Sequence, residues 1–497
     1  MSDPDRSDES GATPGRGTGA RSDAGAAAPG ARPAKFLGGS LMRHVVTMSL
    51  SASVGLVSVF IVDFADLYFI SLLGEAELAA AVGFAGTLLF LVFSAAIGLA
   101  IAMAALVAPR VGRGELDEAR TVAGGVMIAG VALFVVLTAI AFLWRAEAIA
   151  LLGATGRTHA LAVDFLAIVL PAMPFGAIGM MGSAVLRAHG DARRAMQVTL
   201  WAGGVNAVLD PLFIFALGLG LDGAAWATVA ARAAMAAAAV LAVRRHYGGF
   251  TWPGPARLAA DLRPMFAIAG PAVLTNIATP IGNGIATRAI APFGDGAVAA
   301  WAVIGRLTPL AFCVLFAVSG AVGPIIGQNA GAERYERVRE TLLRAMQFVA
   351  LAVLVSWALL LAARSLIVEQ FGLGPEGARL LWWFAVAVAP LSLFNGALFV
   401  SNAAFNNLHR PLWATWLNWG RHTLGVAPFV WVGAVVGGAP GVLVGQALGG
   451  FVFGLLGLWL AARLIDGYAG GRLDREGHRS PPLMRARPDA PFTSPRG

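Results

Sequence analysis

The stretch Gly-Glu-Ala-Glu-Leu-Ala-Ala at residues 74–80 returns as Gly-Asp-Gly-Ala-Val-Ala-Ala at residues 294–300, an offset of 220 residues. The loop that follows it also repeats, since Gly112 corresponds to Gly331 at an offset of 219. Three further matches, with offsets of 217 to 219, are Asp117 with Glu336, Arg120 with Arg339 and Pro211 with Pro428. The chain is therefore predicted to consist of two related halves.

The composition around this repeat is that of a protein dissolved in lipid. Hydrophobic residues make up 58% of the 497 residues and charged residues only 13%, whereas a soluble domain carries about 25% charged residues. Apolar stretches long enough to span a bilayer recur between residues 44 and 464. We therefore expect an all-α membrane protein.

Each half contains six such stretches. We expect helices over residues 43–72, 77–107, 119–143, 161–188, 196–219 and 222–244, and then over 264–292, 296–327, 340–363, 378–408, 411–436 and 439–464. Because six is an even number, both halves enter the membrane from the same side and are related by a pseudo-twofold axis along the membrane normal. The predicted fold is twelve transmembrane helices in two six-helix bundles.

Composition also divides the chain into segments. The first 38 residues hold almost no large apolar side chain, which predicts disorder, and they lack the short apolar core of a signal peptide. Gly and Pro are frequent in residues 245–262. The predicted segments are a disordered cytoplasmic tail over 1–40, a first bundle over 41–245, a cytoplasmic linker over 246–262, a second bundle over 263–466 and a disordered cytoplasmic tail over 467–497.

The arginines between the helices predict the orientation. Fifteen lie in the even-numbered connections and four in the odd-numbered ones, and cytoplasmic loops carry the excess of basic residues. Both termini are thus expected on the cytoplasmic side of a bacterial or archaeal inner membrane. This distribution accounts for the net charge of +8 without a nucleic-acid partner. The expected partners are membrane lipid and a small-molecule substrate, and the chain is expected to act as a monomer.

Some kinds of chemistry are excluded by residues that the sequence lacks. The only cysteine, Cys313, rules out a disulfide framework or a thiolate metal site built within one chain. The only lysine is Lys35, and no Gly-rich phosphate loop ends in Lys-Ser or Lys-Thr, so direct drive by ATP is not expected. No His-Glu-x-x-His spacing occurs. A transporter without a cofactor, driven by a gradient of protons or Na⁺, is favoured over an enzyme.

Acidic residues lie inside the predicted spans of the first half, and none lies inside those of the second. An ionised side chain at the bilayer centre costs at least ~2.5–3.5 kcal/mol, so such residues are candidates for function. In the repeat, Asp63, Asp66 and Asp210 correspond to Asn283, Ala286 and Ala427, while a fourth acid, Asp164, lies at the outer end of its helix. This contrast predicts that ion coupling resides in the first bundle.

Asp66 and Asp210 are the main candidates for the coupling site. Asp63 lies three residues before Asp66, and Asn206 four residues before Asp210, so each pair shares a helix face. Together with Thr228 they are expected to line one pocket. Such a pocket suits a proton shared between the carboxylates, and it equally suits a sodium ion held by Asp66, Asn206, Asp210 and Thr228. The structural alternative is that Asn206 and Thr228 only bridge helices by hydrogen bonds.

Basic and aromatic residues inside the spans are harder to assign. Arg232 follows Thr228 by four residues and is placed to pair with an aspartate. For Arg306, Arg421 and His422 the alternatives are an anionic substrate group, helix carbonyls or a water-filled cytoplasmic vestibule, and we favour the vestibule. The candidate substrate-binding residues are Arg306 and three aromatics that either stack on a flat cation or simply pack, namely Trp201, Trp226 and Trp301.

Four stretches together resemble the multidrug and toxic compound extrusion (MATE) family, and within it the DinF-like branch. They are Ala-Asp-Leu-Tyr-Phe-Ile-Ser-Leu-Leu-Gly (65–74), Leu-Arg-Ala-His-Gly-Asp-Ala-Arg-Arg-Ala-Met (186–196), Asn-Ala-Val-Leu-Asp-Pro-Leu-Phe-Ile (206–214) and Gly-Ala-Ala-Trp-Ala-Thr (223–228). The resemblance covers residues 40–464 and implies antiport, in which members export toxic, often cationic, compounds and admit protons or sodium ions. It implies ion-coupling roles for Asp66, Asn206, Asp210 and Thr228.

Two positions depart from other members. Many members have a proline in the first helix, where this chain has Ser51 opposite Pro271 of the repeat. Thr279 stands where another branch carries a glutamate, which favours the DinF-like branch. The predicted function is a secondary active antiporter that exports amphipathic, cationic drugs or toxic organic compounds in exchange for protons or sodium ions. The alternatives are a flippase for lipid-linked precursors and an intramembrane transferase acting on a lipid carrier.

Overall fold

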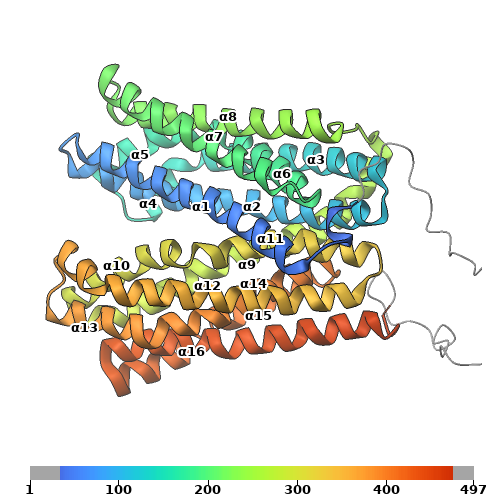
Figure 1. The fold of residues 1–497 in the computed structure, drawn as a ribbon. Helices are drawn as coiled ribbons and strands as arrows, with labels where there is room; N and C mark the ends of the chain where they lie inside the picture. The colour runs from blue at the N-terminus through green and yellow to red at the C-terminus, as the bar shows by residue number, and fades with distance from the viewer. Residues whose placement is uncertain (1–33, 474–497) are drawn as a thin grey trace, which may run out of the picture. The chain divides into compact units, whose positions relative to one another are not determined.

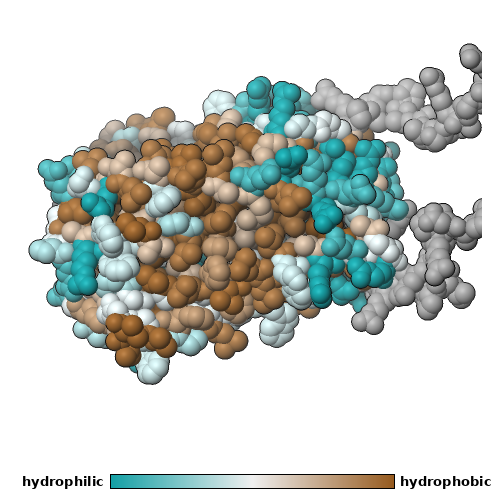
Figure 2. Space-filling model, turned by 60° about the horizontal axis from the view of Figure 1, so that its bottom comes forward, coloured by the Kyte–Doolittle hydropathy of each residue, from teal (hydrophilic) through white to brown (hydrophobic). Residues whose placement is uncertain are grey.

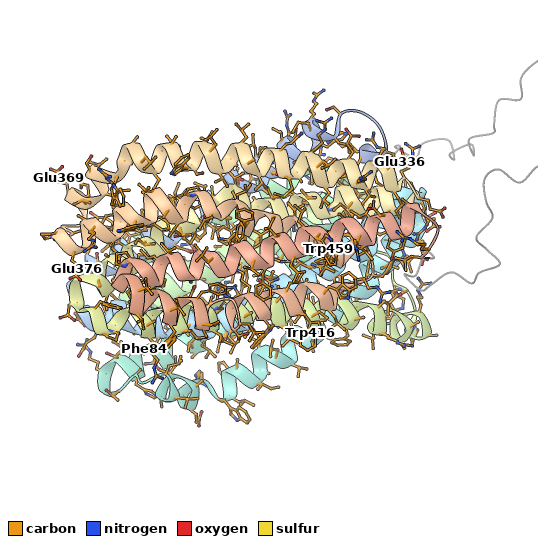
Figure 3. The ribbon with its side chains drawn as sticks, turned by 90° about the horizontal axis from the view of Figure 1, so that it is seen from below. Phe84, Glu336, Glu369, Glu376, Trp416 and Trp459 are labelled. Atoms are coloured by element: carbon orange, nitrogen blue, oxygen red, sulfur yellow. The ribbon has the colours of Figure 1, made fainter. Side chains whose placement is uncertain are left out.

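The computed structural model describes residues 34–473, and the regular elements of this part are all helices. Eleven of the described helical segments are long and apolar enough to cross a membrane. A broad apolar band covers the face seen in Figure 2, with hydrophilic residues gathered toward its two edges. Helix α12 (Tyr335–Gln370) runs between these edges, with Glu336 near one end and Glu369 near the other (Figure 3). The charges thus lie where a bilayer would leave them in water.

The two halves of the sequence form two helical bundles (Figure 1). The first consists of α1 (Leu41–Ser71), α2 (Ala76–Arg113), α3 (Leu116–Leu143), α4 (Arg145–Leu151), α5 (Gly156–Val169), η2 (Leu170–Ala172), α6 (Met173–Ala188), α7 (Ala192–Pro211), η3 (Leu212–Ala216) and α8 (Gly220–Tyr247). The second consists of α9 (Pro255–Ile290), η4 (Ala291–Phe293), α10 (Asp295–Ala311), α11 (Cys313–Gly331), α12, α13 (Pro375–Trp383), η5 (Phe384–Val388), α14 (Ala389–Asn407), α15 (Pro411–His422) and α16 (Ala427–Ala469). The predicted all-α architecture is confirmed.

The last apolar segment contains two crossings. Helix α16 reverses at Gly438, whose φ of 61° lies in the left-handed region that glycine tolerates. Its two arms then pack tightly, since a Cβ on Gly433 would lie 2.0 Å from the carbonyl oxygen of Gly441. A Cβ on Gly449 would likewise lie 1.8 Å from the carbonyl oxygen of Gly425. With this reversal, the eleven segments supply the twelve predicted crossings.

One predicted helix is interrupted. The sequence predicts a continuous helix over 296–327, but α10 ends at Ala311 and α11 begins at Cys313, with Phe312 at φ −112° and ψ 25° between them. Pro309 lies in the last turn of α10, and a proline removes one backbone hydrogen bond and crowds the preceding turn. Apolar periodicity alone does not reveal such a break, because both pieces remain apolar.

The segment boundaries also need correction. Helix α9 begins at Pro255, inside the predicted linker 246–262, because proline is favoured in the first turn of a helix. Helix α16 continues to Ala469, beyond the predicted end of the second bundle at 466. The predicted disordered tails lie mainly outside the described residues, at 1–33 and 474–497.

The part of the N-terminal tail that the structure describes is ordered, contrary to the prediction for 1–40. Lys35–Leu37 form the short helix η1, and Phe36 is fully buried. The Phe36 amide donates to Gln328 Oε1 at 3.0 Å, and its carbonyl accepts from Arg337 at 3.1 Å. Lys35 Nζ donates to the carbonyl of Gly190 at 2.9 Å. Segment η1 therefore ties the second bundle to the first.

The bundles also meet where α2 crosses α11. A Cβ on Gly112 would lie 2.1 Å from the carbonyl oxygen of Gln328, and one on Gly331 would lie 2.1 Å from that of Pro109. Gly112 and Gly331 are the partners found in the sequence repeat, so the crossing is symmetric. Both glycines lie at the ends of their helices toward the arginine-rich loops. This end of the interface is closed by direct backbone contact.

Candidate functional site

Asp66, Asn206 and Asp210 lie together between α1 and α7. Asn206 Nδ2 donates to Asp66 Oδ1 at 3.0 Å and to Asp210 Oδ2 at 2.7 Å. One amide group thus bridges two acids that the sequence separates by more than a hundred residues.

Burial distinguishes the three side chains. Asp210 is completely buried and Asn206 is 5% exposed, whereas Asp66 is half-buried. The second carboxyl oxygen of Asp210, Oδ1, is buried without a hydrogen-bond partner in the structure. A buried carboxylate oxygen without a partner loses its hydration and gains nothing in return. A proton or a cation bound at Asp210 Oδ1 would satisfy it.

Local sequence explains how the acids come together. Gly203 allows α7 to approach α1 closely, since a Cβ there would lie 2.9 Å from Ser58 Oγ. Helix α7 ends at Pro211, directly after Asp210, and continues as η3, a five-residue π-helical turn. Such turns are rare and often mark functional sites. Asp210 therefore sits where the regular backbone pattern of its helix changes.

The remaining candidates of the first bundle lie around this trio but do not bond to it. Among the described residues, no hydrogen bond joins Thr228 or Asp63 to Asp66, Asn206 or Asp210. Asp63 is exposed and lies within electrostatic range of Arg232. The Arg232 guanidinium contacts Met173 Sδ. The predicted pairing of Arg232 with an aspartate is thus an electrostatic attraction to Asp63 without direct contact.

The candidate substrate-binding residues are dispersed. Trp201 is 66% exposed and Trp226 is 50% exposed, while Trp301 donates to Thr287 Oγ1 at 2.9 Å. Arg306 is exposed. Within residues 34–473, no hydrogen bond or ion pair connects any of the four to the acid trio. The structure does not gather them into one pocket.

Two polar residues of the second bundle that sequence reasoning missed are Gln446 and Asn395. Gln446 Nε2 donates to Asn283 Oδ1 at 3.4 Å, and Asn283 is the repeat partner of Asp63. His422, which is 3% exposed, lies 3.4 Å from Thr279 Oγ1 through its Nε2. Amides carry no charge, so a search for charged side chains inside the spans passes over Gln446 and Asn395.

The metal-binding capacity of the site is limited to oxygen ligands. The described residues contain no group of three or more His, Cys, Asp or Glu side chains that could hold a metal ion. At the trio, carboxylate oxygens are available, the ligand type that suits a hard cation. The Asn206 amide is oriented with its NH₂ group toward both acids. A sodium ion would therefore be held by Asp66 and Asp210 rather than by the Asn206 oxygen in this arrangement.

The MatE family model matches residues 52–212 and 271–432, one match in each half of the repeat. The chain belongs to the MATE family of efflux transporters. The predicted family is thus confirmed, as is the prediction of a transporter rather than an enzyme.

Similar proteins agree with this assignment. The chain is 26% identical over 443 residues to an FAD transporter of Shewanella oneidensis. This alignment covers 87% of this chain and 96% of that protein. It is 23% identical over 297 residues to the multidrug export protein MepA of Staphylococcus aureus, covering 58% of this chain and 64% of MepA.

Solved structures of this family share the fold. The MATE transporter VcmN of Vibrio cholerae, in its bent form, has a TM-score of 0.80 and is 26% identical, covering 86% of this chain and 98% of VcmN. A MATE protein in the straight conformation has a TM-score of 0.82 at 22% identity, covering 88% of this MATE chain and 99% of that one.

Proposed function

We propose that this MATE transporter is an antiporter that exports amphipathic organic compounds and is driven by protons or sodium ions bound at Asp66 and Asp210. Asn206 holds the two carboxyl groups together, and Asp63 and Thr228 support the site from the neighbouring turn of α1 and from α8. The observation that carries the proposal is the buried Asp210 Oδ1 atom, which has no hydrogen-bond partner. The other oxygen of the same carboxyl group accepts from Asn206, whose amide bridges both acids.

The helix that carries Asp66 supports a route from ion binding to conformational change. Helix α1 packs on α7 and α8 of its own bundle and on α11 and α12 of the other bundle. A proton or sodium ion at Asp210 neutralises charge at the α1–α7 contact. If the ion binds one arrangement of the bundles more tightly than the other, it shifts the balance between inward-facing and outward-facing states.

The closed end of the interface between the bundles is consistent with the same proposal. The α2–α11 glycine crossing and segment η1 both join the bundles at the helix ends that lie toward the arginine-rich loops. Export requires this end to open toward the cytoplasm and close again. We propose that ion binding at the trio biases that equilibrium, because α1 begins four residues after η1 ends.

The names of the relatives point to different substrates. One relative is named an FAD transporter and another a multidrug export protein. We take ethidium, a cationic dye, and FAD as the two probes for this chain. We further propose the DinF-like branch, which the acids of the first bundle and Thr279 favour, a cytoplasmic-membrane location with both termini inside, and a monomeric state.

The test is efflux measured in inside-out vesicles with an imposed pH gradient and, separately, a sodium gradient. The wild type is expected to move ethidium or FAD under one of the gradients. Asp66→Asn and Asp210→Asn are expected to fail at normal membrane levels. Gradient-dependent transport that survives in folded Asp210→Asn would contradict the coupling site.

A further inference from the structure

Arg421 lies where a helix of the second bundle breaks inside the membrane. Helix α15 begins at Pro411, and ten residues at about 1.5 Å each place Arg421 about 15 Å along it, half of the ~30 Å hydrocarbon thickness. The helix ends at His422, and residues 423–426 form a turn before α16 begins at Ala427. Broken helices near the midplane form the binding sites of many secondary transporters. Arg421 therefore occupies a position suited to a ligand.

The Arg421 guanidinium has no counter-ion. Among the described residues it makes neither a hydrogen bond nor an ion pair, and its Nε atom is shielded from solvent without a partner. The acidic residues labelled in the second bundle, Glu336, Glu369 and Glu376, lie toward the helix ends (Figure 3). A buried charge costs several kcal/mol unless an opposite charge and hydrogen bonds compensate it. An anion from outside the chain would supply both.

Gly450 lets two polar side chains come close to the backbone of α16. A Cβ at Gly450 would lie 3.7 Å from Arg421 Nε and only 2.8 Å from Asn395 Oδ1, so both polar groups meet at this glycine. Asn395 Oδ1 is also buried without a hydrogen-bond partner. Rotation of the Asn395 amide by half a turn would present its NH₂ group beside Arg421 instead. Arg421 and Asn395 then offer converging donors, the arrangement that binds phosphate and carboxylate groups.

The surroundings of Arg421 are polar, and within residues 34–473 no acidic side chain pairs with it. Gln446 lies one turn before Gly450 on the same face of α16 and donates to Asn283. His422, next to Arg421, has its Nδ1 atom buried without a partner. These groups extend the donors and acceptors available to a ligand. The charge of the site is opposite to that of the acid trio in the first bundle.

We infer that Arg421, together with Asn395, binds the phosphate or carboxylate group of a transported organic anion. This inference rests on the proposed function, because it assigns the substrate class of the same transporter. The acid trio would bind the coupling ion and Arg421 the anionic end of the substrate. FAD, which carries a diphosphate, and riboflavin, which has the same ring system without phosphate, form a matched pair of probes.

The test is equilibrium binding to the purified full chain in neutral-lipid nanodiscs, measured by flavin fluorescence anisotropy. No ion gradient is present, so the result is independent of coupling. The wild type is expected to bind FAD at least about tenfold more tightly than riboflavin, and Arg421→Gln to lose that preference. Arg421→Lys should retain part of it, because a lysine keeps the charge without the bidentate geometry.

Two variants guard against a folding defect. Gly450→Ala keeps the charge but displaces the Asn395 amide, because its Cβ would lie 2.8 Å from Asn395 Oδ1, and it should weaken FAD binding while riboflavin binding stays unchanged. Arg463→Gln removes an arginine that stacks on Trp459 at 4.4 Å and should leave FAD binding unchanged.

Three results would overturn the inference. They are equal wild-type affinity for FAD and riboflavin, unchanged FAD affinity in folded Arg421→Gln and Gly450→Ala, or loss of FAD binding when phosphatidylglycerol is added to the nanodiscs. The last would assign the site to a lipid headgroup rather than to a substrate.

Discussion

The two bundles share a fold but carry opposite charges in their interiors. In the first, Asp66 and Asp210 meet at Asn206, beside the proline that ends α7. In the second, the repeat partners of both acids are alanines, Ala286 and Ala427, and the charge near the helix break is Arg421. At this position the duplicated scaffold has thus kept a helix break and exchanged its polar groups.

The structural elements that the two bundles share and the charged groups in which they differ therefore serve separate purposes. The symmetric elements are structural, as at the α2–α11 crossing, where Gly112 and Gly331 play the same role. The asymmetric elements are charged groups that need a partner from outside the chain. We expect symmetric positions to govern the opening of the bundles and asymmetric ones to govern what is bound.

The largest expected effect is that of Asp210→Asn. This change removes the charge of the one carboxyl group of the trio that is completely buried, so ion-driven efflux of either probe should fall to background in vesicles. The matched control is Ala427→Asn at the partner position of the second bundle, which should leave gradient dependence intact. Equal loss in both variants would show that the two bundles do not differ as described.

Asn206→Ala should have a smaller effect. It removes two hydrogen bonds that stabilise the ionised carboxylates, each worth about 1.5–3 kcal/mol, and should therefore raise the apparent affinity for a coupling proton by at least about tenfold. The measurement is efflux rate against proton or sodium concentration. Asn283→Ala, at the partner position of Asp63 in the second bundle, is the control and should shift the ion dependence little. An unchanged ion dependence in Asn206→Ala would show that this amide has no role in ion coupling.

Gly331→Ala tests the symmetric part of the comparison. A Cβ there would lie 2.1 Å from the carbonyl oxygen of Pro109, and overpacking of this kind costs about 1–3 kcal/mol. The expected result is a lower Tm and easier opening at this end, read out by thermal unfolding and by labelling of an introduced cysteine. Gly320→Ala in the same helix, where no atom lies within 4 Å of the added Cβ, is the control. Equal Tm values for the two variants would count against a tight crossing.

The smallest effect is expected at Asp191, whose side chain caps α7 in the first bundle. In the second bundle, Arg410 precedes α15 and does not cap that helix through its side chain. Burial raises the pKa of Asp191, but hydrogen bonds from Arg194 and Tyr247 outweigh it and leave the pKa below its ordinary value. The stabilisation is therefore complete above the ordinary carboxyl pKa of about 3.9 and is lost as the pH falls through the lower folded value.

At pH 7, Asp191→Ala should lower the free energy of unfolding by about 1 kcal/mol, because alanine cannot cap the helix. Thermal unfolding would show this against Asp222→Ala, which changes an exposed acid of α8. A Tm for Asp191→Ala equal to that of the wild type at pH 7 would contradict the capping role.

Local patterns made much of this molecule predictable. The apolar stretches, the repeat at Gly112 and Gly331 and the acids inside the spans are all visible along the chain, and the four-residue spacing of Asn206 and Asp210 places both on one helix face. The contact of that face with Asp66 needed only the assumption that buried acids seek partners.

Other features depend on tertiary packing. Within residues 34–473, Thr228 on α8 makes no hydrogen bond to the trio, and no residue spacing indicates this. Phe36 sits in a segment whose average composition predicts disorder, yet its buried ring and three hydrogen bonds between its backbone and the side chains of Gln328, Asn329 and Arg337 fix it. Asn395 and Gly450 acquire meaning only because three helices bring them beside Arg421.

The division between a coupling site in the first bundle and a substrate site in the second is tested most directly by one transport measurement. Ethidium and FAD uptake into inside-out vesicles would be followed under the driving gradient for wild type, Asp210→Asn and Arg421→Gln. The account predicts that Asp210→Asn loses gradient-driven uptake of every probe that the wild type moves, whereas Arg421→Gln loses FAD uptake and keeps that of ethidium. If Arg421→Gln abolished ethidium uptake as well, or Asp210→Asn kept gradient-driven uptake of either probe, the division of roles between the bundles would be wrong.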